Sequence, residues 1–335
     1  MILLTGGSGH VGQNLLRELL AQGAQVRALV RPGTSRAPFE GLKVELAEGD
    51  LTDGPSLRKA MQDVTHVYHC AARVQTVRGR ERELYATNVL GTRALLRAAR
   101  DAKVKRVVVT SSLGAVGHPG DRPATEDDGF NPFEHHLPYE ASKAWVEHEC
   151  LKAVVEGLDV VIGVSTAVLG PYDFGPSRMG RVIKDFANRK LGAYIPGGFE
   201  FVGAQDLARG HILAMEKGQT GQRYILSSEF LTVDALMDLL EKIAAVPKPK
   251  LRLPPAVMMG VAHVSTAVLN TVAPERPQRF TPDAVRLLSM QRRASCDKAK
   301  SELGYRPTPI EGAVQAAYDW FVAHGDVAKP SAART

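Results

Sequence analysis

Tyr139, Lys143 and Ser112 are the residues whose types and spacing could carry out proton transfer to a substrate oxygen. Tyr139 and Lys143 lie four positions apart in Tyr139-Glu140-Ala141-Ser142-Lys143, so on a helix they share one face. A neighbouring ammonium is expected to lower the pKa of the phenol, which could then exchange a proton near neutral pH. Ser112 lies just after the β-branched strand expected over 106–110 and could hydrogen-bond the same oxygen. YxxxK alone is common on surface helices, and the conjunction with Ser112 favours catalysis.

A glycine-rich turn near the start of the chain indicates a dinucleotide site. Gly6, Gly9 and Gly12 have the spacing GxxGxxG, directly after a short apolar run and at the start of an amphipathic helical pattern. Such glycines allow a tight turn, the approach of backbone N–H groups to a pyrophosphate and close helix–strand packing. The positive end of the helix dipole would then face the phosphates.

The residues after the next two expected strands bear on the choice of nucleotide. NAD-binding units usually carry an acidic residue near the end of the second strand, whereas this chain reads Leu29-Val30-Arg31-Pro32. A guanidinium can hydrogen-bond a 2′-phosphate bidentately, so we expect NADP(H) to be preferred, with NAD(H) possible. Asp50, in Gly49-Asp50-Leu51, could accept a hydrogen bond from the adenine amino group. The alternatives are a solvated loop arginine and an ordinary loop-starting aspartate.

Alternating strand and helix patterns predict an α/β protein built on a Rossmann-type doubly wound parallel sheet. We expect an NADP-binding unit over 1–169, to which 200–228 returns, a smaller C-terminal substrate lobe over 170–199 and 229–325, and a frayed tail over 326–335. Thr232 is the expected N-cap of a helix. The expected strands are 2–5, 25–30, 44–47, 66–71, 106–110 and 160–164, and the expected helices are 83–102, 139–156, 179–189, 204–217, 233–245 and 309–324.

Composition argues against several other classes of protein. The formal net charge is +6, but the basic residues are scattered and form no stripe, so no nucleic-acid partner is expected. Three cysteines without CxxC or metal-ligand spacing indicate reduced thiols in a cytoplasmic protein and no metal site. No run reaches the ~20 apolar residues of a spanning helix. The most apolar segment, 255–272, is expected to be buried or to line a pocket, with loose membrane-surface contact as the alternative and no stable membrane insertion.

In its first half the chain resembles an extended short-chain dehydrogenase/reductase of the NAD-dependent epimerase/dehydratase family. It is most similar to the dihydroflavonol-reductase-like group, which also contains hopanoid-associated sugar epimerases and is near the 3β-hydroxysteroid dehydrogenases. The later stretch 221–226 also resembles the family. The matching pieces are Thr5-Gly6-Gly7-Ser8-Gly9-His10-Val11-Gly12, Gly49-Asp50-Leu51, His69-Cys70-Ala71-Ala72, Asn88-Val89-Leu90-Gly91-Thr92, Thr110-Ser111-Ser112, Tyr139 to Lys143 and Gly170-Pro171.

The resemblance implies roles for individual residues. It implies that Ser112, Tyr139 and Lys143 are catalytic, with Val168 near the nicotinamide, and that two such chains form a homodimer through two helices each. Ser165 stands where family members often have proline, which leaves the detail of the nicotinamide wall open. The residues implied to line the cofactor, besides Tyr139 and Lys143, are Gly6, Gly9, His10, Val11, Gly12, Arg31, Asp50, Leu51, Ala71 and Ala72.

These features together predict a reductase that uses NADPH to convert a ketone on a small molecule into an alcohol. Apolar and aromatic residues of the second half favour a lipophilic or aromatic substrate, although any of them could be core: Tyr172, Phe174, Phe199, Phe201, Met258 and Met259. One alternative is a sugar-nucleotide epimerase or dehydratase that retains its NAD(P). The other is a non-catalytic nucleotide-sensing protein on the same fold.

Overall fold

The computed structural model describes residues 1–74, 80–134, 136–254, 256–260, 262 and 282–328. Most of the apolar segment 255–272 lies outside these residues, so its predicted role in a pocket is not addressed. Residues 329–335 of the predicted tail also lie outside them. Val327, in contrast, is buried and Asp326 forms an ion pair with Lys184. The tail was therefore predicted to begin too early, because these two residues pack against the body of the protein.

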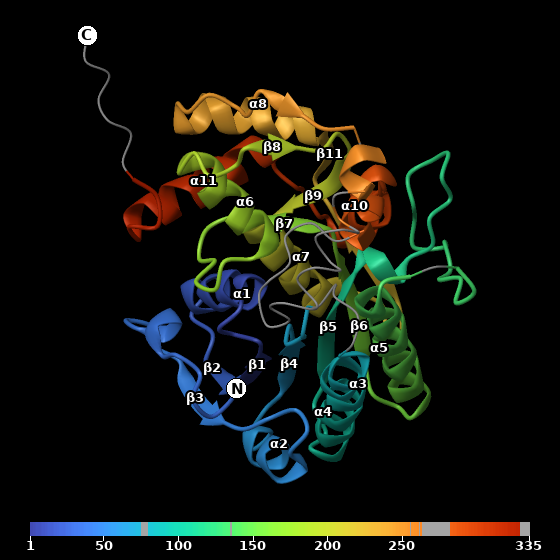
Figure 1. Cartoon of the computed structure of the whole chain (residues 1–335). Coiled ribbons are helices and arrows are strands. Elements are labelled where there is room, and N and C mark those ends of the chain that lie inside the picture. Colours follow the sequence, from blue (N-terminus) through green and yellow to red (C-terminus); the bar gives the residue numbers. More distant parts are fainter. Residues whose placement is uncertain (75–79, 135, 255, 261, 263–281, 329–335) are drawn as a thin grey trace.

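A seven-stranded, wholly parallel sheet forms the centre of the molecule (Figure 1). Its order is β3-β2-β1-β4-β5-β6-β10, so the chain reverses direction across the sheet between β1 and β4. In doubly wound sheets a ligand crevice lies at that switch point, outside the carboxyl ends of the strands. The predicted fold class is confirmed. The strands are β1 (Ile2–Thr5), β2 (Val26–Val30), β3 (Glu45–Glu48), β4 (His66–His69), β5 (Arg106–Ser112), β6 (Val160–Ser165) and β10 (Arg223–Leu226).

Helices cover both faces of this sheet because successive strand residues point to opposite sides. Val107 and Val109 of β5 join one core with α2 (Gly54–Ala60), α4 (Gly91–Asp101) and α5 (Pro138–Val155). Val108, between them, joins a second core with α1 (His10–Ala21) and α7 (Ala204–Lys217). The unbroken apolar run of β5 is thus explained by burial on both faces.

A π-helical turn interrupts the helix that was predicted over 83–102. The segment consists of α3 (Glu81–Tyr85), the π-turn η2 (Ala86–Leu90) and α4. Asn88, inside the turn, accepts from the Arg73 backbone N–H and donates through Nδ2 to the hydroxyl of Ser142. A π-turn inserts one residue into the helical repeat, and here the side chain at that point links two other segments. An apolar periodicity cannot reveal such a polar constraint.

A smaller lobe lies beyond the carboxyl ends of the central strands (Figure 1). Its sheet, in the order β11-β9-β7, was not predicted and consists of β7 (Ala167–Leu169), β9 (Gly198–Gly203) and β11 (Glu229–Thr232). The Thr232 hydroxyl accepts from the Ala235 N–H and caps the following helix, as predicted. The lobe's other elements are α6 (Arg178–Ala187), α8 (Val233–Ala244), α10 (Pro282–Ser289), α11 (Ile310–Ala323) and the two-stranded pair β8 (Ala193–Tyr194) and β12 (Leu251–Arg252).

The glycine turn connects β1 to α1 at the switch point, and its glycines are required by close backbone contacts. A Cβ on Gly12 would lie 2.1 Å from the carbonyl oxygen of Gly6. Gly6 has a φ of +75°, and a Cβ there would lie 2.6 Å from the backbone nitrogen of Ala71. The first turn of α1 is thus pressed against the loop that follows β1, and no larger residue fits between them.

Substitution of Gly12 by alanine should destabilise the protein by about 3 kcal/mol, since the methyl group would force the helix away from Gly6. Gly9→Ala is the matched control. Its Cβ would lie 3.4 Å from the same oxygen, and its φ of −88° suits any residue. The free energy of unfolding from denaturant titration checks both variants. Equal stability of the two would contradict the contact.

Candidate active site

The predicted catalytic residues come together at the carboxyl end of β5. Lys143 is buried on α5, and its Nζ donates to the Thr110 carbonyl oxygen at 2.7 Å. This bond sets the side of α5 that carries Tyr139 and Lys143 against the end of the strand. Ser112, the last residue of β5, lies near enough to the Tyr139 phenol for hydrogen bonding that acts to lower the pKa of the phenol. The Ser112 oxygen also accepts from the Gly114 N–H at 3.3 Å, which leaves its own proton for the phenol.

The pKa of Tyr139 differs from the sequence-based expectation. Burial raises the pKa of this phenol to about 12, while the hydrogen bond from Ser112 and the positive charge of Arg178 act in the opposite direction. The predicted lowering by Lys143 is wrong for this structure, because the ammonium is held by the Thr110 carbonyl and burial is the largest effect. At neutral pH the phenol is protonated, which is the form that a proton donor needs.

A buried ion pair that sequence reasoning missed lies one helical turn beyond Lys143. Glu147 accepts from the Ser111 hydroxyl and pairs with Arg223 of β10 at 2.9 Å. Burial lowers the pKa of Lys143 to about 8, and the charge of Glu147 opposes that shift. Glu147 is thus one of several neighbours that act against the lowering of the lysine pKa. The spacing of Glu147 four residues after Lys143 was the available signal, but its partner lies 76 residues away.

A chain of hydrogen bonds runs through the switch point behind the glycine turn. The Thr92 hydroxyl donates to the Asn88 carbonyl, so His69 Nε2 must donate to the Thr92 oxygen at 2.9 Å. His69 Nδ1 then accepts from the Thr5 hydroxyl at 2.7 Å. Burial lowers the pKa of His69 to about 3, so the ring is neutral and acts as a fixed spacer between β1, β4 and α4.

A second buried histidine fixes the end of β5 from the other face of the sheet. His211 Nδ1 donates to the Leu207 carbonyl, and its Nε2 accepts from the Thr110 hydroxyl at 2.8 Å. Burial lowers the pKa of His211 to about 4. The Thr110 hydroxyl is therefore bonded to His211 of α7 on one face of the sheet. Its carbonyl oxygen is bonded to Lys143 of α5 on the other face.

The turn between β1 and α1 fits a dinucleotide pyrophosphate. The first N–H groups of a helix lack partners within the helix and favour anions. Among the described residues, a Cβ on Gly9 would meet only the Gly6 carbonyl oxygen within 4 Å, so that part of the chain leaves room for a ligand at this side of the turn. The predicted lining residues Leu51, Ala71 and Ala72 follow the ends of β3 and β4, at the same edge of the sheet.

Arg31 and Asp50 lie just beyond the ends of β2 and β3. The Arg31 side chain is exposed, and its charge contributes to lowering the pKa of Asp50. The main cause of that lowering is Thr52, whose hydroxyl and backbone N–H both donate to Asp50 Oδ1, at 2.6 and 2.8 Å. Asp50 Oδ1 therefore stabilises the turn that follows β3, whereas Asp50 Oδ2 makes no hydrogen bond within this turn.

The remaining predicted cofactor residues border the smaller lobe. His10 Nε2 contacts the Gly170 carbonyl oxygen at 3.1 Å, and burial lowers the pKa of this imidazole. Val11 is in the first turn of α1, and Val168 is partly buried in the middle of β7. Ser165 ends β6, and its hydroxyl donates to the Ser111 carbonyl at 3.1 Å. A proline at this position would lack that bond.

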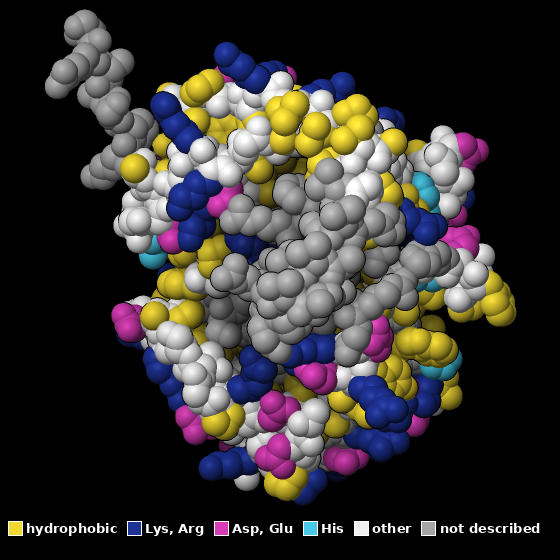
Figure 2. All heavy atoms as spheres, in the orientation of Figure 1, with side chains coloured by type: hydrophobic (Ala, Val, Ile, Leu, Met, Phe, Trp, Pro, Cys, Tyr) yellow, Lys and Arg dark blue, Asp and Glu magenta, His cyan; other side chains and the backbone are white. Residues whose placement is uncertain are grey.

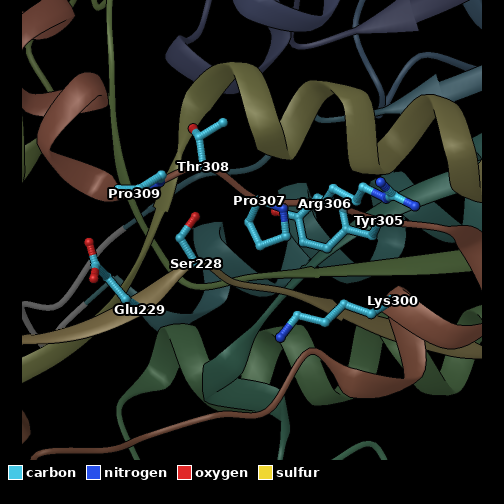
Figure 3. Close-up of a pocket in the computed structure, with 8 residues that line it drawn as sticks. All are labelled: Ser228, Glu229, Lys300, Tyr305, Arg306, Pro307, Thr308 and Pro309. Atoms are coloured by element: carbon cyan, nitrogen blue, oxygen red, sulfur yellow. The ribbon is translucent and has the colours of Figure 1, made fainter.

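Other surface features are separate from this cluster. Figure 2 shows acidic and basic side chains interspersed over the part of the face that carries the central sheet. A hollow of about 550 Å³ lies between the turn after β10 and the segment before α11, and it contains none of the predicted site residues (Figure 3). Within the described ranges, no cluster of three or more potential metal ligands occurs and no helix is long and apolar enough to cross a bilayer.

Comparison with known proteins identifies the family. Residues 2–227 match the model of the NAD dependent epimerase/dehydratase family. The chain is 41% identical to sterol demethylase protein B of Methylococcus capsulatus over 96% of its own length and 98% of the relative's. It is 36% identical to a putative dihydroflavonol 4-reductase of Synechocystis over 97% and 95% of the two lengths. The solved structure of gox2253 superposes with a TM-score of 0.85 at 34% identity, covering 98% of this chain and 99% of that one. The chain belongs to the NAD-dependent epimerase/dehydratase family and is an NAD(P)-dependent oxidoreductase.

Proposed function

We propose that the protein reduces a ketone on a lipophilic or aromatic small molecule to an alcohol, with NADPH as the reductant. The observation that carries the proposal is the juxtaposition of Ser112, Tyr139 and Lys143 at the carboxyl edge of the sheet, on the same edge as the glycine turn. A family relative named as a dihydroflavonol 4-reductase supports ketone reduction, and one named as a sterol demethylase protein supports a lipophilic substrate.

The chain's own residues would perform the proton chemistry. The nicotinamide cofactor, when bound, supplies the hydride. The Tyr139 phenol, protonated at neutral pH, donates its proton to the oxygen that becomes the alcohol. The Ser112 hydroxyl, which lies near the phenol, could hydrogen-bond the same oxygen. Lys143, bonded to the Thr110 carbonyl, holds the face of α5 that carries Tyr139 against the end of β5.

Arg31 supports NADP(H) over NAD(H). Its guanidinium is exposed at the end of β2, where a 2′-phosphate would lie, and no carboxylate precedes it in the strand. Glu48, at the end of β3, is paired with Arg36, and Asp50 is engaged by Thr52. The positive charge of Arg31 therefore dominates the position that distinguishes the two nucleotides.

The outer face of α5 and the neighbouring π-turn support a homodimer. Trp145 is 50% exposed and Leu151 is 48% exposed on α5. Tyr85, just before the π-turn, and Leu90, the last residue of the turn, are also exposed. We propose that a second copy of the chain covers this apolar face, because such residues in a contiguous surface are typical of subunit contacts.

Replacement of Tyr139 by phenylalanine should lower kcat by a factor of about 100 to 10,000, since the proton donor is lost while the ring remains. NADPH consumption with a panel of steroid ketones, a dihydroflavonol and aryl ketones measures the rate. Affinity for NADPH should be unchanged, and Tyr85→Phe serves as the control. A wild-type rate in Tyr139→Phe would contradict the assignment. Oxidised nucleotide that co-purifies, with conversion of nucleotide sugars and no net NADPH consumption, would instead favour an epimerase or dehydratase.

Replacement of Arg31 by alanine should weaken NADPH binding about tenfold to a hundredfold and leave NADH binding unchanged. The estimate follows from the loss of hydrogen bonds to a charged phosphate, about 1.5–3 kcal/mol. Dissociation constants from nucleotide fluorescence measure the effect. Arg36→Ala, at an exposed arginine paired with Glu48, is the matched control. Equal affinity of both nucleotides in wild type and in Arg31→Ala would remove the claim.

Replacement of Trp145 by aspartate should convert a dimer into a monomer, because a charge would be placed in the centre of the apolar contact. Sedimentation velocity reports the mass. Leu251→Asp alters an equally exposed apolar residue on β12 and should leave the dimer intact. A wild-type protein that is monomeric at micromolar concentration would contradict the proposal.

A further inference from the structure

We propose that Arg292, from the chain that follows α10 in the smaller lobe, is a positioning residue that holds the segment after Ser112 against the helix turn that carries Tyr139. The inference rests on the proposed function, because it concerns the geometry of that catalytic pair.

The Arg292 guanidinium spans two segments that belong to different elements. Its NH1 donates to Glu140 Oε1 at 2.9 Å, and its NH2 donates to the Val116 carbonyl at 2.7 Å. Glu140 directly follows Tyr139 in the first turn of α5. Val116 ends the short 3₁₀ turn η3 (Leu113–Ala115) that begins immediately after Ser112. The Arg292 side chain is therefore bonded both to the helix turn that contains Tyr139 and to the segment that follows Ser112.

The ion pair between Arg292 and Glu140 is buried, so the loss of either partner should have a large effect. Arg292 and Glu140 each expose only 10% of their side chains, so the ion pair is largely shielded from water. The other Glu140 oxygen accepts from the Leu137 N–H and closes the start of α5. The backbone of the η3 turn also packs tightly against Glu140, since a Cβ on Gly114 would lie 2.7 Å from Glu140 Cγ. Removing one partner of such a pair leaves an uncompensated buried charge. It would also release the η3 turn and the first turn of α5 from each other.

The backbone around Arg292 is itself anchored at several points. The Ala124 N–H donates to the Arg293 carbonyl, and the Ser295 N–H donates to the Ala124 carbonyl. The Ala294 N–H donates to Glu200 of β9 at 3.2 Å. Leu288 of α10 packs against the lobe, where a Cβ on Gly197 would meet its carbonyl oxygen at 2.5 Å. Because its backbone is fixed to the smaller lobe, the Arg292 guanidinium holds the segments next to Tyr139 and Ser112 in a set position relative to that lobe.

Other charged groups face Arg292 but do not replace Glu140. Glu134 and His118 both interact electrostatically with the guanidinium. Burial lowers the pKa of Arg292, and the negative charge of Glu140 is the largest effect that opposes this shift. Arg293, the adjacent residue, instead stacks over the Phe230 ring at 4.7 Å and touches neither catalytic segment. It supplies a control that shares the same backbone.

The test compares Arg292→Gln with Arg293→Gln in the NADP+-bound full-length protein. Amide hydrogen exchange should become about tenfold faster in peptides covering 113–117 and 137–141 of Arg292→Gln only, as both segments lose their common anchor. The kcat for the best ketone of the panel should fall about a hundredfold, with an unchanged KM for NADPH. Arg292→Lys, which keeps the charge but can reach only one partner, should lie between Arg292→Gln and wild type.

The double variant Glu140→Gln/Arg292→Gln separates positioning from misfolding. It removes the uncompensated buried carboxylate and should regain thermal stability but not kcat. Unchanged exchange in both segments of Arg292→Gln, or faster exchange with an undiminished kcat, would overturn the inference. If wild type reduces no ketone, the proposed function fails, and the exchange measurement alone decides whether Arg292 anchors the two segments.

Discussion

The hydrogen bond from buried Lys143 to the Thr110 carbonyl is the contact on which the site depends. An ammonium removed from water requires strong polar partners, and here the partners are the end of β5 and the nearby charge of Glu147. The bond decides which face of α5 meets the sheet, and therefore where Tyr139 stands relative to Ser112. Burial on two faces of β5 supplies the packing energy that keeps this arrangement in place.

A layer of neutral polar groups surrounds the charged core of the site. His69 and His211 are both too deeply buried to be protonated at physiological pH, and each has both ring nitrogens occupied. They orient the ends of β1, β4 and β5 without adding charge that would repel Lys143. The charged contacts, Glu147 with Arg223 and Glu140 with Arg292, lie farther along α5 and at its beginning. The two ion pairs thus hold α5 on either side of Lys143: one lies next to Tyr139 in the first turn, and the other lies one turn beyond the lysine.

The sequence predicted what depends on short-range pattern, and missed what depends on distant partners. Every strand of the central sheet except β10 follows from apolar runs, and the glycine turn follows from glycine spacing. Thr232 was correctly identified as a helix cap. The three-stranded sheet of the smaller lobe was missed because its strands lack a long unbroken apolar run: β7 has three residues, β9 contains Glu200 and β11 begins at Glu229. The Arg292–Glu140 pair spans 152 positions, and no local pattern points to it. The pKa of Tyr139 was misjudged for the same reason, since burial is a tertiary property.

A crystal structure with bound NADP+ tests the central claim most directly. The account predicts that the nicotinamide ring lies beside the Tyr139 hydroxyl, with the pyrophosphate on the glycine turn and the 2′-phosphate next to Arg31. Ser112 should remain in contact with the phenol. A nucleotide bound elsewhere, or a phenol turned away from the nicotinamide ring, would contradict the account.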